Sequence, residues 1–70
     1  MSKGSRHDDT GWLNDVQGQL VLRRDAGGQW RLDMGFWQTW QSRKLLGQRV
    51  RVTGVRDDFD ILAVDRIAAL

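Results

Sequence analysis

Residues 19–34 read QLVLRRDAGGQWRLDM, a stretch in which apolar side chains alternate with polar ones on both sides of a turn. Leu20 and Leu22 share one face before the turn, and every second residue from Trp30 to Met34 shares one face after it. The intervening Asp-Ala-Gly-Gly supplies residues that tolerate positive φ. The pattern therefore predicts a β-hairpin with one buried face and one outward face.

Three further segments have the alternation of half-buried strands: residues 11–16, 48–55 and 61–67. Their inward positions are predicted to be Leu13, Val50, Val52, Leu62 and Val64. Gly54 indicates a bulge or tight bend where a barrel turns a corner. Ile67 is out of phase with the rest of its strand, and a bulge near Asp65 would restore it.

Between the hairpin and the last two strands, residues 36–46 change to a helical pattern that ends at Gly47. Trp37 and Trp40 fall on one arc of this predicted short helix. A core this small cannot easily bury both indoles. We expect one or both to cover the open end of the fold or to contact another protein, where tryptophan is enriched.

The predicted element order is β-β-β-α-β-β. At this length it favours a mainly β, five-stranded closed barrel with one short helix between strands 3 and 4, because closure removes exposed sheet edges. An SH3-like barrel has a similar size and strand number and is the structural alternative. The helical segment before the fourth strand fits that alternative less well.

The length and composition indicate one small domain without disulfide bonds. The chain has 70 residues, a formal net charge of +2 and no cysteine. Residues 1–10 contain Met1 as their one apolar residue, and we expect them to form a flexible tail before a single barrel domain over residues 11–70. No apolar run is long enough for a membrane-spanning helix. We therefore expect a cytoplasmic protein without membrane contact.

The sequence offers little material for catalysis or metal binding. It has no cysteine and no glutamate, and its single histidine, His7, lies in the predicted tail. We therefore expect no enzyme activity, no cofactor and no metal site. The adjacent Asp57 and Asp58 lack the spacing of known calcium loops and are more typical of turns.

The second half of the chain resembles oligonucleotide/oligosaccharide-binding (OB) folds. The resemblance rests on LGQRVRVTG at residues 46–54 and LAVDRI at residues 62–67, and it covers residues 10–70. These motifs are similar to those of a largely uncharacterised group of short bacterial OB-fold domains. The resemblance implies an OB-like Greek-key barrel that binds its ligands on the outer face of the second and third strands, between two flanking loops.

The outward positions suggest a non-catalytic binding module for single-stranded DNA or RNA. Arginine beside an aromatic residue suits such a ligand, because guanidinium attracts phosphate and bases stack on indole. The candidate residues are Trp12, Arg23, Arg31, Arg51 and Phe59. Three aspartates around Phe59 oppose phosphate binding, and Phe59 could instead plug the core or its rim.

Three other interpretations remain open at this stage. The arginines could form a merely solvated face, with Arg23 or Arg31 paired to Asp25 or Asp33. The module could bind a protein partner, or a second copy of itself, through Trp37 and Trp40. The same outer face could also bind a small anionic ligand or a sugar.

Overall fold

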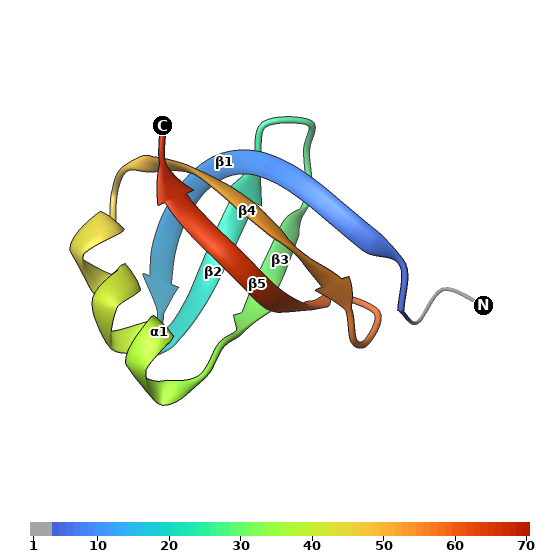
Figure 1. The fold of residues 1–70 in the computed structure, drawn as a ribbon. Coiled ribbons are helices and arrows are strands. Elements are labelled where there is room, and N and C mark those ends of the chain that lie inside the picture. The colour runs from blue at the N-terminus through green and yellow to red at the C-terminus, as the bar shows by residue number, and fades with distance from the viewer. Residues whose placement is uncertain (1–3) are drawn as a thin grey trace.

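The computed structural model describes residues 4–70, which form five strands and one short helical region (Figure 1). The elements are β1 (Arg6–Val16), β2 (Gln19–Arg24), β3 (Gln29–Asp33), α1 (Phe36–Ser42), η1 (Arg43–Leu45), β4 (Arg49–Arg56) and β5 (Ile61–Ala69). The predicted helix over residues 36–46 is thus an α-helix whose last turn tightens into the 3-10 helix η1.

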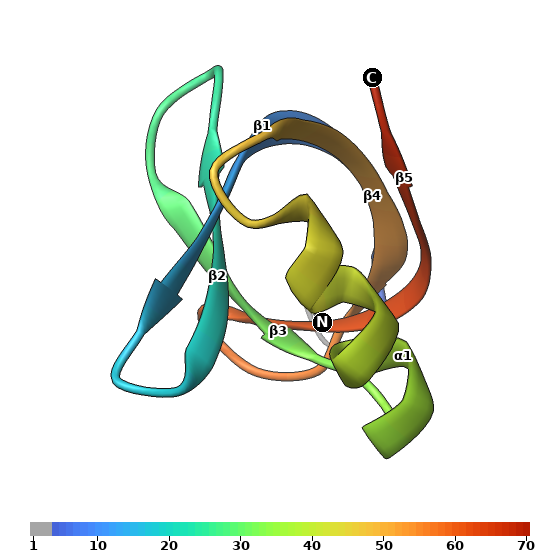
Figure 2. The ribbon, with the colours of Figure 1, turned by 90° about the vertical axis from the view of Figure 1, so that its left-hand side faces the viewer.

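The strands close into a barrel in the order β1-β2-β3-β5-β4, with β4 returning to β1. All neighbours are antiparallel except β3 and β5, which run parallel. Figure 2 shows α1 in front of one end of this ring. The predicted fold class, a mainly β five-stranded OB-like barrel with one short helix between strands 3 and 4, is confirmed.

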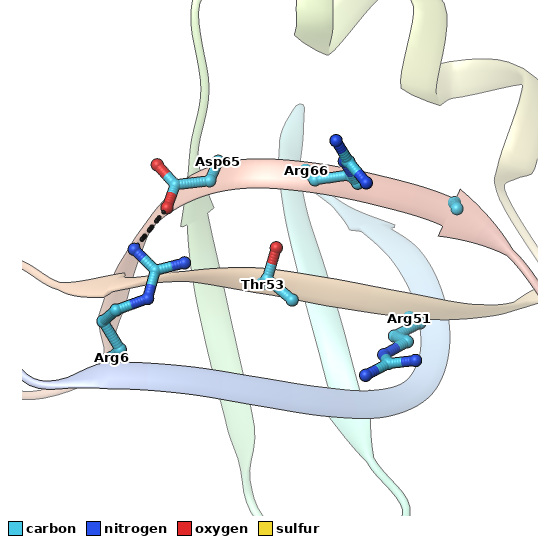
Figure 3. A pocket seen from close by; sticks show the side chains of 6 residues that line it. Arg6, Arg51, Thr53, Asp65 and Arg66 are labelled. Carbon is cyan, nitrogen blue, oxygen red and sulfur yellow. Dashed lines mark hydrogen bonds and ion pairs between the residues drawn. The ribbon is translucent and has the colours of Figure 1, made fainter.

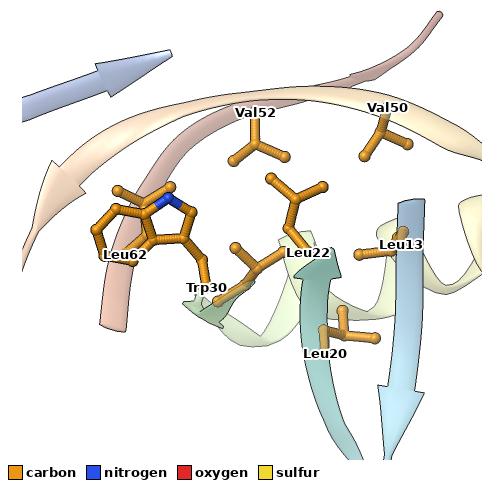
Figure 4. Close-up of a cluster of buried hydrophobic side chains, with 8 residues drawn as sticks. Leu13, Leu20, Leu22, Trp30, Val50, Val52 and Leu62 are labelled. Carbon is orange, nitrogen blue, oxygen red and sulfur yellow. The ribbon is translucent and has the colours of Figure 1, made fainter. Parts of the chain in front are cut away.

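The core is a cluster of alternating strand residues (Figure 4). It contains Leu13, Leu20, Leu22, Trp30, Leu32, Val50, Val52 and Leu62. Met34, Leu45 and Leu46 pack against it beside the helix, so aliphatic and thioether side chains cover that end of the barrel. The predicted inward faces of the strands are therefore confirmed.

Val21 is an exception to the predicted alternation. Its place on β2 puts it on the outer face, yet it is buried and lies outside the core cluster. It pairs with Asn14 on β1 and with Arg31 on β3. A short side chain between two longer ones in the middle of a sheet is covered from both sides, which the alternation alone does not predict.

The first strand begins at Arg6, so the expectation of a flexible tail is wrong for residues 6–10. This part of β1 pairs with β4, and Gly4 and Ser5 continue the backbone hydrogen bonding with Arg56. The half-buried Asp9 links the segment to the core, since it accepts a hydrogen bond from Nε1 of the buried Trp30 at 2.8 Å. The part of the predicted tail at residues 1–3 lies outside the described residues.

The bulge predicted near Asp65 is confirmed. Thr53 pairs with Arg66, whereas the next residue, Gly54, pairs with Val64, so Asp65 is the extra residue on β5. Gly54 lies at this irregularity, where a Cβ atom would be 2.3 Å from the carbonyl oxygen of Ala63. The two strands can approach this closely only because residue 54 has no side chain.

Candidate nucleic-acid interface

Trp12 and Arg23 form the centre of the predicted interface. They are directly opposite each other across β1 and β2, and both point outward because their neighbours Leu13 and Leu22 fill the core. Trp12 remains 49% exposed. The two residues line a shallow pocket of about 530 Å³, together with Asn14, Arg24, Asp25 and Gly47.

The Arg23 side chain has no ion pair, hydrogen bond or ring contact within residues 4–70. Most other arginines are paired, and two of these pairs flank the pocket. Arg24 lies 3.4 Å from Asp9, and Arg49, which pairs with Trp12 across β1 and β4, forms an ion pair with Asp25. Arg23 is therefore the uncompensated cation beside the exposed indole.

Arg31 on β3 is held in place by Asp60, the last residue of the loop between β4 and β5. Its Nε and Nη2 atoms donate to the Asp60 carboxylate at 3.2 and 2.8 Å. This hydrogen bonding lowers the pKa of Asp60, so the pair persists below the ordinary carboxyl value of 3.8. The alternative pairing of Arg23 or Arg31 with Asp25 or Asp33 is thus wrong, because Asp60 binds Arg31 and Arg49 binds Asp25.

Arg51 lies on β4, apart from the Trp12 pocket. Its Nε donates to Asp8 at 2.8 Å, and its Nη2 donates a second hydrogen bond to the same carboxylate. The hydrogen bonding lowers the pKa of Asp8, which therefore stays ionised in moderate acid. Arg51 lines a different hollow from Trp12 and Arg23, so the predicted binding residues do not form one continuous pocket.

Phe59 occupies the tip of the β4–β5 loop and is 82% exposed. The guanidinium of Arg56 lies 5.5 Å from its ring centroid. Phe59 therefore does not plug the core. Its ring is open to solvent close to the Arg31–Asp60 pair, but the carboxylates of Asp57 and Asp58 adjoin it in the chain.

The helix carries the largest exposed aromatic surface. Trp37 is 71% and Trp40 is 56% exposed, and Phe36 is more exposed still. The rings meet edge to face, with centroids 6.0 Å apart for Phe36 and Trp37 and 6.2 Å apart for Trp37 and Trp40. The two indoles therefore do not close the barrel end.

A second basic surface, which the sequence analysis missed, lies over β1, β4 and β5. Arg6, Arg51, Thr53, Asp65, Arg66 and Ala68 line it, and we call it the Arg66 groove (Figure 3). Arg6 was missed because it was assigned to the tail. Simple alternation with Leu62 and Val64 would turn Arg66 inward, but the predicted bulge at Asp65 reverses that phase and turns it outward.

The described part of the chain contains neither a metal-ligand cluster nor a membrane-spanning helix. No three histidine, cysteine, aspartate or glutamate side chains among residues 4–70 are grouped so that they could hold a metal ion. No helix in the same range combines the length and apolar character needed to cross a membrane.

The fold and its surface define a small five-stranded β-barrel domain with basic and aromatic residues on its outer face. The chain belongs to the family described as "Protein of unknown function (DUF5818)", which it matches over residues 10–70. No curated protein and no solved structure matches the chain.

Proposed function

We propose that this protein is a non-catalytic, cytoplasmic binding module of the bacterial OB-fold type, which contacts single-stranded nucleic acid through Trp12 and Arg23. The observation that carries the proposal is the exposed Trp12 indole directly opposite a guanidinium without a partner in residues 4–70. A base stacked on an indole contributes about 1 to 3 kcal/mol, and the neighbouring guanidinium can bind the adjoining phosphate.

A single strand fits this surface better than a duplex does. Stacking on Trp12 requires a base that is free of its complementary strand. The Asn14 amide in the same pocket has both a donor and an acceptor for the edge of such a base. Proteins usually read a duplex by placing an α-helix or a two-stranded ribbon in its major groove. Here the β-strands around the pocket form a curved surface, and the seven-residue α1 carries aromatic rather than basic side chains.

The proposal predicts that Arg23→Gln weakens oligonucleotide binding. Each phosphate contact on a single strand contributes a log–log salt slope of about −0.7, so its loss should lower affinity about eightfold at about 50 mM salt. Fluorescence anisotropy of labelled, mixed-sequence DNA and RNA of about 12 nucleotides measures this directly.

Lys44→Gln is the matched control for this experiment. It removes the same charge at an exposed position beside Trp40 on the helical side, and it should leave the affinity close to that of the wild type. The proposal fails if the wild-type protein does not bind either oligonucleotide at the lower salt concentration. It also fails if Arg23→Gln binds as tightly as the wild type.

The exposed aromatic residues of α1 favour a second candidate function, in which two copies of the chain associate through this helix. Phe36, Trp37 and Trp40 form a contiguous edge-to-face cluster, and exposed apolar clusters of this kind mark interaction surfaces. Two such helices packed together would remove both clusters from water.

Self-association predicts that the wild-type chain is a dimer and that Trp37→Ala is a monomer. Removing the central ring of the cluster takes away the contact that both neighbours share. Sedimentation equilibrium gives the mass directly, and Trp12→Ala, which removes an exposed indole outside the helix, should remain dimeric. A monomeric wild-type protein at the highest concentration measured would contradict this candidate.

A further inference from the structure

The Arg66 groove is a hollow on the outer face of the barrel, with a volume of about 590 Å³. Its side chains come from three neighbouring strands, β1, β4 and β5. Figure 3 shows Arg6 toward one end and Arg51 toward the other, with Thr53 between them and Arg66 above. Three guanidinium groups and one hydroxyl group are therefore gathered around one space.

The groove carries excess positive charge. Arg6 donates to Asp65 at 2.9 Å across β4, and Arg51 is held by Asp8 from outside the groove. The side chain of Arg66 has no ion pair, hydrogen bond or ring contact within residues 4–70. With both ion pairs counted, Arg66 is the one arginine of the groove whose charge is left uncompensated within residues 4–70.

The groove continues the surface on which Trp12 lies. Trp12 pairs with Arg49 on β4, and Arg51 and Thr53 follow at alternate positions on the same face of that strand. Arg49 and Thr53 are four steps apart along the extended chain, which corresponds to about 13 Å. Thr53 in turn pairs with Arg66 on β5. Outward side chains therefore lead from the exposed indole to the groove: Arg49 and Arg51, which are ion-paired with Asp25 and Asp8, and then Arg66, which has no partner in residues 4–70.

The chemistry of the groove suits phosphate rather than a base. Guanidinium groups bind phosphate oxygens through paired N–H donors, and the Thr53 hydroxyl can add another donor. None of the lining residues is aromatic, so the groove offers no surface on which a base could stack. At one end of the groove, Arg6 is already bound to Asp65 and is less available to a phosphate. Arg66 and Thr53 are therefore the donors of the groove that can bind a phosphate without first breaking a contact within residues 4–70.

We propose that the Arg66 groove binds the phosphate backbone of a nucleic-acid strand whose base stacks on Trp12. This inference rests on the proposed function and adds a second contact to it. The strand crosses from the pocket of Trp12 and Arg23 over β1 and β4 to β5. Strands long enough to reach the groove then bind more tightly than short ones.

The test measures two labelled DNA strands, of about 2 and 12 nucleotides, against the wild-type protein and Arg66→Gln at about 50 mM salt. The longer strand should lose about eightfold in affinity, because one phosphate contact is removed, and the shorter one should be unaffected. Arg66→Lys, which keeps the charge, should retain most of the affinity. Circular dichroism of each variant shows that the barrel is intact.

The outcomes separate this inference from the proposed function. If Arg66→Gln binds the longer strand as tightly as the wild type, the second contact is wrong and the Trp12 site stands. An equal loss for both lengths would also overturn the inference, because the effect would then come from overall charge. If the wild-type protein binds neither strand, the proposed function and the inference fail together.

Discussion

Gly54→Ala is expected to destabilise the barrel strongly, so that it unfolds at a much lower urea concentration than the wild type. The new Cβ atom would lie 2.3 Å from the carbonyl oxygen of Ala63 and 3.0 Å from its carbon. Both are backbone atoms of the partner strand, so the contact can be relieved only by separating β4 from β5. Strain of this kind costs more than about 3 kcal/mol, a large part of the stability of a domain this size.

Urea unfolding followed by circular dichroism measures the effect, and the chain supplies a matched control. Gly35→Ala makes the same chemical change where a Cβ atom meets nothing within 4 Å and where φ is −63°. This control should unfold close to the wild-type urea concentration, because the lower preference for alanine at the N-cap of α1 offsets the gain from a stiffer unfolded chain. A Gly54→Ala protein with the wild-type midpoint would show that β4 and β5 do not approach each other this closely.

Much of the barrel could be predicted because its information is local. The alternation around Trp30 and the glycines of the preceding turn define the hairpin within a few residues of each other. The phase break at Ile67 required a bulge, and Asp65 is the residue that bulges. Each of these inferences uses side chains that are neighbours in the sequence.

The first residues of β1 could not be predicted because their partners are distant in the chain. The segment from Arg6 to Thr10 has no apolar alternation, and its order comes from pairing with β4. Asp9 is fixed by Trp30, and Asp8 by Arg51, which lies 43 residues away. A short window of sequence contains none of these contacts.

The candidate site was only partly predictable, because it depends both on local alternation and on contacts between residues that are distant in the chain. Alternation alone placed Trp12 and Arg23 on the outer face, where they meet across β1 and β2. Whether an arginine is free for a ligand depends on which aspartate the closed barrel brings to it. Asp60 reaches Arg31 and Asp8 reaches Arg51, whereas Arg23 and Arg66 are left without a partner in residues 4–70.

Trp12→Ala is expected to cause the largest loss of nucleic-acid affinity, because it removes the stacking surface itself. A stacking energy of about 1 to 3 kcal/mol corresponds to about a 5- to 150-fold weaker complex. Stacking releases no counterions, so the loss should be the same at about 50 and 200 mM salt. Arg23→Gln should differ in kind, since removing a phosphate contact makes the log–log salt slope shallower by about 0.7.

Anisotropy titrations of both variants over this salt range therefore separate the two roles within one pocket. Trp12→Phe keeps an aromatic ring and should recover part of the affinity. Trp40→Ala removes an exposed indole from the helix and should bind as the wild type does. If Trp40→Ala lost affinity and Trp12→Ala did not, the strand would lie on the helix rather than on β1. A changed salt slope in Trp12→Ala would mean that this indole positions a phosphate contact instead of stacking on a base.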